Sequence, residues 1–200
     1  MVTMRQETGS NPQQATKKVS IQVKLGGRSF SADNYVVADD IAQVEFIIDT
    51  PRVTLAPSGW IQQYGSEATL REGGKANLSN ELCVCSDEQA EIVAAIAIDS
   101  AAHDAIVEKW GSRTSFTSPL LNMRHSDKHC LTIDASEHVC YIRLFENGLQ
   151  RAEAYDISTE EDILYLASEW LEGNDIPIYI KNGTAQAKLL RKYFKRVVCE

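Results

Sequence analysis

The order of apolar segments in residues 130–197 constrains the fold of this chain more than any other feature of the sequence. Segments rich in β-branched and aromatic residues follow one another there, with short polar stretches between them. Asn147-Gly148 separates the last two, and Asn-Gly between such segments is the strongest short-range signal for a β-hairpin. The pattern therefore predicts three antiparallel strands, at Cys130–Asp134, Val139–Phe145 and Leu149–Tyr155.

A helix, a strand and a second helix are predicted to complete this half of the chain. Ser158 and Glu161 have the spacing of a capping box, and apolar residues follow at helical spacing. Pro177–Ile180 predicts a short buried strand, and Ala185–Val197 predicts an amphipathic helix. Three antiparallel strands followed by helix, strand and helix form the layout of a ribonuclease-H-like half-domain.

Residues 17–118 show a less regular version of the same alternation. Val19–Val23 alternates apolar and polar residues, Gly26-Gly27 supplies a turn and Phe30–Ala32 continues beyond it, which predicts a hairpin. Val44–Asp49 predicts a strand, and Val53–Leu55, which lies between two prolines, predicts a short edge strand. The other elements expected here are a helix over Ser58–Leu70 that Gly73-Gly74 would end, strands over Leu82–Ser86 and Glu91–Ile98, and a helix from Asp99 or Ser100 to Gly111.

The predicted central strand and the predicted domain boundary both lie in the middle of the chain. Glu91–Ile98 is nearly continuous in apolar residues, which is typical of a strand inside a sheet. Ser112–Lys128 is polar and contains Pro119, so we interpret it as a connector. We expect an α/β protein with mixed sheets: a disordered leader at residues 1–16, a first half at 17–118 and a second half at 119–200.

Composition excludes several classes of protein. Hydrophobic residues make up 44% of the 200 residues and charged residues 24%, the balance of an ordinary globular protein. The five cysteines are odd in number and irregularly spaced, which is typical of a reducing compartment, so we expect a cytoplasmic protein. No apolar run approaches the roughly 20 residues of a membrane-spanning helix. The net charge of -8 argues against general affinity for nucleic acid.

The end of the chain is basic although the whole chain is acidic. The predicted last helix carries most of these charges, and two interpretations stay open. They form either a solvated helix face or a contact surface for an acidic protein, RNA or a membrane surface. The residues are Lys181, Lys188, Arg191, Lys192, Lys195 and Arg196.

Three passages carry a family resemblance. They are Val19-Ser-Ile-Gln-Val-Lys-Leu-Gly-Gly-Arg-Ser-Phe30, Val53-Thr-Leu-Ala-Pro57, and the stretch from Leu131 to Val198, which contains Ile133-Asp-Ala-Ser-Glu-His-Val-Cys-Tyr-Ile142, Glu146-Asn-Gly148 and Ser158-Thr-Glu-Glu-Asp-Ile-Leu-Tyr165. In these passages the chain resembles a Bacteroidetes family of unknown function whose members are assigned an actin-like ATPase fold. The resemblance implies two similar ribonuclease-H-like halves around a cleft, as in pilus-assembly and cell-division actin homologues.

The resemblance also implies where a nucleotide would bind. Active actin-like ATPases hold phosphates in two β-hairpin turns, each usually built on Asp-x-Gly, because Asp reaches the metal shell and Gly lets backbone amides approach phosphate. In the first turn Gln22 stands where the Asp is expected. In the second turn Asp134 is present, but Ala135 stands where Gly is wanted and Glu137 adds negative charge. Both turns are therefore predicted to be degenerate.

A third element of such a site is the adenosine turn, which Asn182-Gly-Thr-Ala185 resembles because it follows a predicted strand and precedes a predicted helix. Simpler interpretations exist for these positions: Asp134 is a strand-end carboxylate that caps a turn, and Asn182-Gly183 is an ordinary turn. We predict no catalytic residue. The candidate relics of a nucleotide site are Gly26, Gly27, Asp134, Ser136, Asn182, Gly183 and Thr184.

Two other groups of residues have the side chains of a chemical site. Zinc favours nitrogen and sulfur ligands, but no Cys-x-x-Cys pair anchors the histidines and cysteines of residues 125–140, so we predict no metal site. Cys83 and Cys85 would share one face of a strand, which favours core packing. No local signature of a nucleophilic Ser or Cys is present. The zinc candidates were His125, His129, Cys130, His138 and Cys140.

The sequence therefore favours a noncatalytic actin-like module that interacts with a protein partner and needs no cofactor. The alternative is an ATPase that binds ATP and Mg through unusual loops, with Asp134 ordering a metal-bound water and residues 182–185 near the adenine. Mg-dependent ATP binding separates the two hypotheses.

Overall fold

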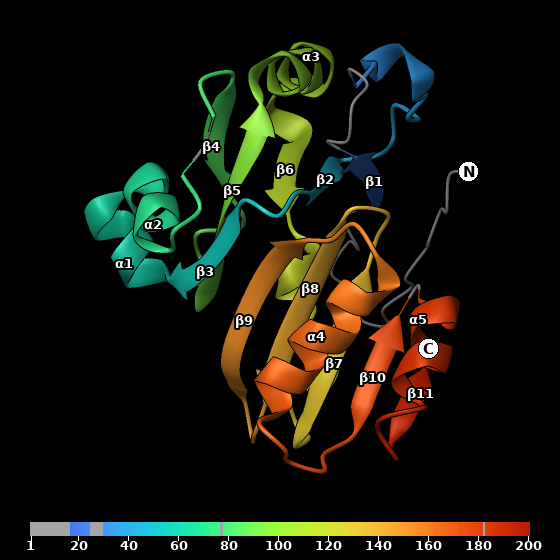
Figure 1. The fold of residues 1–200 in the computed structure, drawn as a ribbon. Helices are drawn as coiled ribbons and strands as arrows, with labels where there is room; N and C mark the ends of the chain where they lie inside the picture. The colour runs from blue at the N-terminus through green and yellow to red at the C-terminus, as the bar shows by residue number, and fades with distance from the viewer. Residues whose placement is uncertain (1–16, 25–29, 77, 182) are drawn as a thin grey trace, which may run out of the picture.

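The computed structural model describes residues 17–24, 30–76, 78–181 and 183–200 (Figure 1). The predicted leader at residues 1–16, the turn at Gly26-Gly27 and the side chain of Asn182 lie outside these ranges. The strands form three sheets and alternate with helices along the chain, which confirms the α/β fold class. Within the described residues no helix is both long and apolar enough to span a bilayer.

The second half forms one complete five-stranded sheet with the order β11-β10-β7-β8-β9. The strands β7, β8 and β9 are antiparallel neighbours, whereas β10 runs parallel to β7 and β11 runs parallel to β10. Helices α4 and α5 supply apolar residues to the core of this half. The bounds are β7 Cys130–Ala135, β8 Val139–Phe145, β9 Leu149–Asp156, α4 Glu160–Leu171, β10 Ile178–Lys181, α5 Thr184–Leu190 and β11 Val197–Cys199.

The predicted long basic helix at the end of the chain is wrong. Helix α5 ends at Leu190, and the chain then forms strand β11. Just before β11, the carbonyl oxygen of Arg196 accepts a 2.8 Å hydrogen bond from the amide of Ile178. Val197 is β-branched and packs against the core of this half, so pairing with β10 overrides the helical pattern. The basic residues are therefore spread over β10, α5, a turn and the approach to β11.

The first half contains a smaller parallel sheet with the order β1-β2-β6. Strand β1 spans Lys18–Lys24, β2 spans Gln43–Asp49 and β6 spans Thr114–Thr117. The predicted hairpin is wrong, because β1 pairs in parallel with β2 and a short 3-10 helix occupies Ala32–Asn34. The alternation in β1 showed which face is buried, but it carries no information about which strand pairs with it.

A second three-stranded sheet is inserted between β2 and β6 in the sequence, with the antiparallel order β3-β5-β4. Strand β3 is at an edge and β5 is central, as predicted. The single predicted helix is divided into α1 and α2 by Gly65, whose φ is 80°. The bounds are β3 Val53–Pro57, α1 Ser58–Tyr64, α2 Ser66–Glu72, β4 Glu81–Cys85, β5 Ile92–Asp99 and α3 Ser100–Trp110.

Helix α3 begins and ends as predicted. The side chain of Asp99 accepts a 3.1 Å hydrogen bond from the amide of Ala102, which caps the first turn, and Gly111 ends the helix with a φ of 52°. The connector prediction missed β6, a short Ser- and Thr-rich strand whose Phe116 lies in register with Phe46 of β2. The division at residue 118 stays a prediction.

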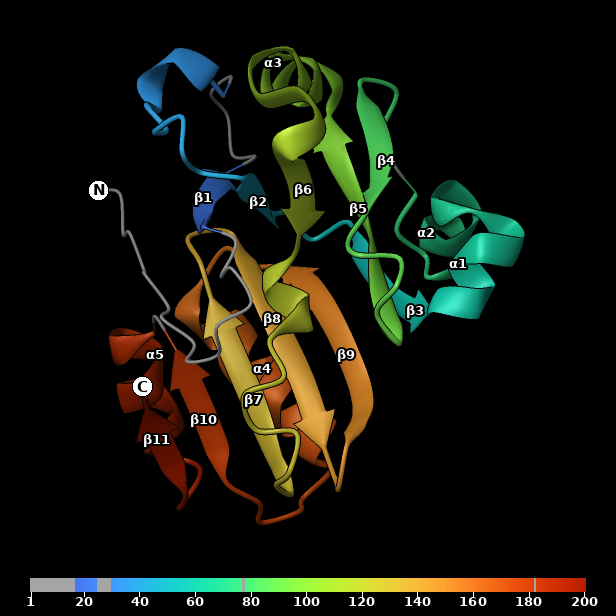
Figure 2. The ribbon, with the colours of Figure 1, turned by 180° about the vertical axis from the view of Figure 1, so that it is seen from behind.

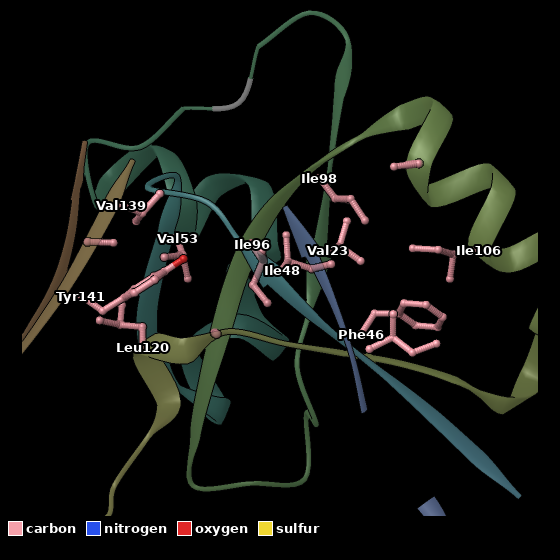
Figure 3. Close-up of a cluster of buried hydrophobic side chains, with 14 of the residues drawn as sticks. Val23, Phe46, Ile48, Val53, Ile96, Ile98, Ile106, Leu120, Val139 and Tyr141 are labelled. Atoms are coloured by element: carbon pink, nitrogen blue, oxygen red, sulfur yellow. The ribbon is translucent and has the colours of Figure 1, made fainter. Parts of the chain in front are cut away.

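One hydrophobic core crosses from the first half into the second (Figure 3). Phe46 and Ile48 of β2 and Ile96 and Ile98 of β5 are fully buried in it. The same cluster continues to Tyr141 of β8 and includes Val139 and Ala154. The two halves are therefore joined by shared side-chain packing, which fixes the geometry of the cleft between them.

Candidate functional site at the cleft between the two halves

The candidate site lies where the carboxyl ends of parallel strands from both halves meet (Figure 2). Ligands of open α/β sheets bind outside the carboxyl ends of the strands. A polar cavity of about 360 Å³ lies here, and the first half contributes Gln22, Asp49 and Thr117 to its lining. The second half contributes Asp134, Ser136 and Lys181. A neighbouring cavity of about 210 Å³ shares Asp49 and Ser136 with the first.

Asp49 connects the two halves by hydrogen bonds at the centre of the cleft. It ends β2, is 6% exposed, and its Oδ1 accepts hydrogen bonds from the Tyr141 hydroxyl at 2.9 Å and from Ser136 Oγ at 3.1 Å. The Tyr141 hydroxyl oxygen in turn accepts a 2.9 Å hydrogen bond from the amide of Thr50. Both donors to Asp49 belong to the β7–β8 hairpin, so this buried polar network connects the end of β2 to the second half.

Burial changes the proton affinity of this network. Desolvation raises the pKa of the Asp49 carboxyl, and the hydrogen bonds from Tyr141 and Ser136 oppose that shift. Burial also raises the pKa of the Tyr141 hydroxyl well above its ordinary value, so the hydroxyl stays protonated and can donate. Because the folded-state pKa of Asp49 is raised, its contribution to stability is greatest at low pH. That contribution declines as pH rises from the ordinary carboxyl range through the raised pKa.

Asp134 lines the larger cavity, as its predicted role in a nucleotide site requires. The side chain is 7% exposed, and its Oδ2 is 3.5 Å from Lys181 Nζ. Asp134 and Lys181 face each other in the β7–β10 register, so the ion pair spans the carboxyl ends of two parallel strands. This placement is equally compatible with a structural strand-end carboxylate.

The turn between β7 and β8 uses its own backbone groups internally. The amide of Ser136 donates to the carbonyl oxygen of Val139 at 2.8 Å, and the amide of Val139 donates to Ser136 Oγ at 3.2 Å. Ala135 is 2% exposed because its methyl group packs into the core of the second half. Glu137 lies at the exposed tip, with Oε2 3.9 Å from Lys24 Nζ. These amides are therefore engaged within the turn, while a phosphate loop presents such groups to its ligand.

Gly183 and Thr184, described residues of the predicted adenosine turn, follow Lys181, which lines the larger cavity. Gly183 and Thr184 themselves line neither of the two cleft cavities. A Cβ on Gly183 would come within 2.8 Å of Ile180 Cδ1, so close packing against β10 explains the glycine at this position. The predicted positions Gly26, Gly27 and Asn182 are outside the described residues.

Sequence reasoning missed Asp49 and Tyr141. A signal for Asp49 was present, since a carboxylate directly after the apolar β-branched run of β2 is placed at the carboxyl end of a strand. Tyr141 carried no comparable signal. Its alternation in β8 indicates only that its side chain points to one face of the sheet, and the partner that makes it important comes from the other half.

The charges around the smaller cavity are a poor fit for a polyphosphate. Acidic Asp49, Glu137 and Asp156 outnumber basic Lys24 and Arg52 in its lining. Arg52 is already paired, because its Nε donates to Glu81 Oε2 at 2.8 Å. Binding of ATP here would place phosphate oxygens near three carboxylates unless a metal ion intervened.

The other predicted group of potential ligands is dispersed. His125 Nε2 lies 2.8 Å from Glu200 Oε1, and the imidazole ring stacks on Tyr179. Cys140 is buried, and desolvation raises its pKa to about 12, which keeps the thiol protonated. Among the residues that the structure describes, no three His, Cys, Asp or Glu side chains gather in the manner of a metal site. Cys83 and Cys85 both pack beside the small core under α1 and α2.

Comparison with known proteins adds information on the fold. No family model and no curated protein sequence matches this chain. A Bacteroides thetaiotaomicron protein with an actin-like ATPase fold and unknown function superposes with a TM-score of 0.64 at 16% identity, over 79% of this chain and 68% of that chain. This chain has an actin-like ATPase fold.

Two further solved structures match with lower scores. An AlfA filament bound to AMPPNP has a TM-score of 0.38 and 13% identity over 78% of this chain and 52% of that chain. The cytoplasmic domain of EpsL, an inner membrane component of the type II secretion system of Vibrio cholerae, has a TM-score of 0.45 and 13% identity over 82% and 81%. At such identities the actin-like likeness concerns the fold and not the activity.

Proposed function

We propose that this actin-like chain is a noncatalytic interaction or assembly module whose nucleotide-binding loops are degenerate. The observation that carries the proposal is the hydrogen-bonded network of Asp49, Tyr141 and Ser136 at the centre of the cleft. It places a buried carboxylate beside the turn to which the resemblance assigns a phosphate. The network is complete without a ligand, and any anion that enters must approach that carboxylate.

The turn after β7 supports the same proposal. Its amides at Ser136 and Val139 are engaged in hydrogen bonds within the turn, so these two amides would have to leave their present acceptors before they could bind a phosphate. Releasing them would leave two buried or half-buried acceptors without partners, at about 1–3 kcal/mol for each unsatisfied group. The excess of acidic residues around the smaller cavity adds to this cost.

Packing between the halves also favours a nucleotide-independent module. The core that contains Phe46 and Ile96 extends to Tyr141 of β8, so the halves are held in one arrangement by apolar contacts and by Asp49. A module of this kind presents a fixed surface to a partner protein and does not depend on a bound nucleotide for its shape.

Isothermal titration calorimetry with ATP, with and without Mg, tests the proposal. We expect no Mg-dependent heat with the wild-type chain at millimolar ATP. Asp134→Ala and the control Asp175→Ala, which removes an exposed carboxylate outside the cleft, should behave like wild type. Mg-dependent binding that Asp134→Ala abolishes and Asp175→Ala preserves would overturn the proposal and support the nucleotide-binding alternative, which the position of Asp134 in the larger cavity favours.

A further inference from the structure

The parallel strands of the two halves differ in what lies at one edge. In the second half, β7 pairs with β10 on one side and with β8 on the other. The strands β1, β2 and β6 are parallel to one another in the same order as β7, β10 and β11. On the side of β1 that corresponds to β8, no strand pairs with it among the described residues, and β1 lies at the outer end of its sheet (Figure 1).

The backbone groups at this edge can be assigned. The carbonyl oxygen of Lys17 accepts hydrogen bonds from the amides of Ala42 and Gln43, so Lys17 directs its backbone groups toward β2. Backbone groups alternate between the two edges of a strand. The groups of Lys18, Ser20, Gln22 and Lys24 therefore point away from β2 and form a row of donors and acceptors at the edge.

The side chains of β1 alternate with the same period. Ile21 and Val23 are buried in the core that the halves share, whereas the side chains of the other set are exposed. A strand added beside β1 would place alternate residues over this core and the others on the open face. The open face of β1 carries a lysine near each end, at Lys18 and Lys24, and no acidic residue.

We propose that the outer edge of β1 binds an extended segment of another protein as an added antiparallel strand. The segment alternates apolar and polar residues and has acidic residues opposite Lys18 and Lys24. The antiparallel direction follows from β8, which occupies the corresponding edge of β7 in that direction. β-strand addition to an exposed edge is a recurrent mode of peptide recognition. The inference rests on the proposed function, because it assigns the contact surface of the proposed interaction module to the edge of β1.

Charge opposes a second copy of β1 as the occupant in the register centred on Ile21. Antiparallel pairing of two β1 strands about Ile21 would place Lys18 of one copy directly opposite Lys24 of the other. Like charges directly opposite each other destabilise a strand pair. Edge lysines are also a common device against self-association of sheets. An acidic partner strand converts the same two positions into favourable pairs.

The present contacts of Lys18 and Lys24 leave both side chains accessible to a partner carboxylate. Lys18 Nζ is 2.6 Å from Glu45 Oε1 and Lys24 Nζ is 3.9 Å from Glu137 Oε2, and both lysine side chains are substantially exposed. Exposed ion pairs contribute about 0–1 kcal/mol. The Lys24–Glu137 pair is of this exposed kind and can be replaced at little cost, whereas Glu45 is 22% exposed, so a partner carboxylate would join Lys18 beside Glu45.

Amide hydrogen exchange on the chain alone tests whether the edge is free. The amides of Ser20 and Gln22 should exchange rapidly, while those of Ile21 and Val23 should be protected by pairing with β2. Protection of Ser20 and Gln22 at the level of Ile21 would show that the edge is already occupied and would overturn the proposal.

Peptide binding tests the occupant. The probe is a fluorescent synthetic peptide, Glu-Val-Thr-Val-Thr-Val-Glu, which matches the seven residues of β1. The control peptide has Lys in place of both Glu residues. We expect fluorescence anisotropy to show binding of the acidic peptide about tenfold or more tighter than that of the basic peptide, together with slower exchange at Ser20 and Gln22.

Two substitutions at one position separate the backbone from the side chain. Ser20→Pro removes the outward amide without removing a hydrogen bond to β2, whereas Ser20→Ala keeps that amide; both lose the hydrogen bond from Ser20 Oγ to Glu45. Ser20→Pro should weaken the acidic peptide by about tenfold relative to Ser20→Ala, with both variants folded by circular dichroism.

Three results would contradict the proposal: absence of acidic-peptide binding, equal binding by both variants, or a wild-type dimer in sedimentation velocity that Ser20→Pro dissociates. The last would identify a second copy as the occupant. None of these results depends on ATP, so failure of the strand-addition proposal and failure of the noncatalytic proposal are distinguishable.

Discussion

The two halves of this actin-like chain reach their stability in different ways. The second half has a complete five-stranded sheet and a core of its own under α4 and α5. The first half has a three-stranded parallel sheet, and its core includes Val139, Tyr141 and Ala154 of the second half. The comparison indicates that the first half depends on side chains of β8 and β9, whereas the core of the second half is built from its own residues.

The largest effect is expected from a cavity in the shared core. Ile48→Ala removes a fully buried side chain of β2 and should reduce the free energy of unfolding by about 2–5 kcal/mol. Because this core reaches β8, we expect denaturant unfolding to stay one transition, and amide exchange in β8 to accelerate together with that in β2.

A surface substitution gives the control for this prediction. Val36 is 90% exposed, so Val36→Ala should change the free energy of unfolding by less than about 0.5 kcal/mol. If Ile48→Ala produced two separate transitions, with protection of β8 unchanged, the halves would be independent and the comparison would fail.

An intermediate effect is expected from the polar contact between the halves. Tyr141→Phe keeps the buried ring but leaves the Thr50 amide without its acceptor and Asp49 with one hydroxyl donor fewer. The expected loss is about 1–3 kcal/mol, measured by urea denaturation. Tyr179→Phe is the matched control, because the Tyr179 ring stacks on His125 and its hydroxyl makes no hydrogen bond to the part of the chain that the structure describes. Equal losses in the two variants would show that the network at Asp49 does not stabilise the fold.

The same contrast explains how far the sequence predicts the fold. The strands β7, β8 and β9 are consecutive antiparallel neighbours joined by short turns, so local signals such as Asn147-Gly148 specify their pairing. In the first half, β1 pairs with β2 across an intervening segment and β2 pairs with the much later β6. Periodicity identifies a buried face but not a distant partner, which is why the hairpin prediction was wrong and β6 was missed.

The residues of the candidate site also differ in whether they come from one local segment or from both halves. The family resemblance assigns Asp134 and Ser136 to the turn of one hairpin, and the structure places both at the cleft. Asp49 and Tyr141 become a site only when they meet, and they lie 92 positions apart in different halves. No local pattern reports such a contact. The predicted nucleotide role of Asp134 and Ser136 stays a prediction that the ATP titration decides.

The smallest effect concerns the start of α4, where sequence and structure differ by one residue. The sequence favours Ser158 and Glu161 as a capping box, but Thr159 Oγ1 accepts a hydrogen bond from the Asp162 amide, and Asp162 Oδ2 accepts one from the Thr159 amide. Thr159→Ala should therefore cost about 1 kcal/mol in thermal or urea unfolding. Ser158→Ala keeps the backbone amide that bonds Asp162 and should change stability by less than about 0.5 kcal/mol. A larger loss of stability for Ser158→Ala than for Thr159→Ala would place the cap at Ser158. Because even this most regular helix needed the structure to fix its first residue, a local pattern determines the type of an element better than its boundary.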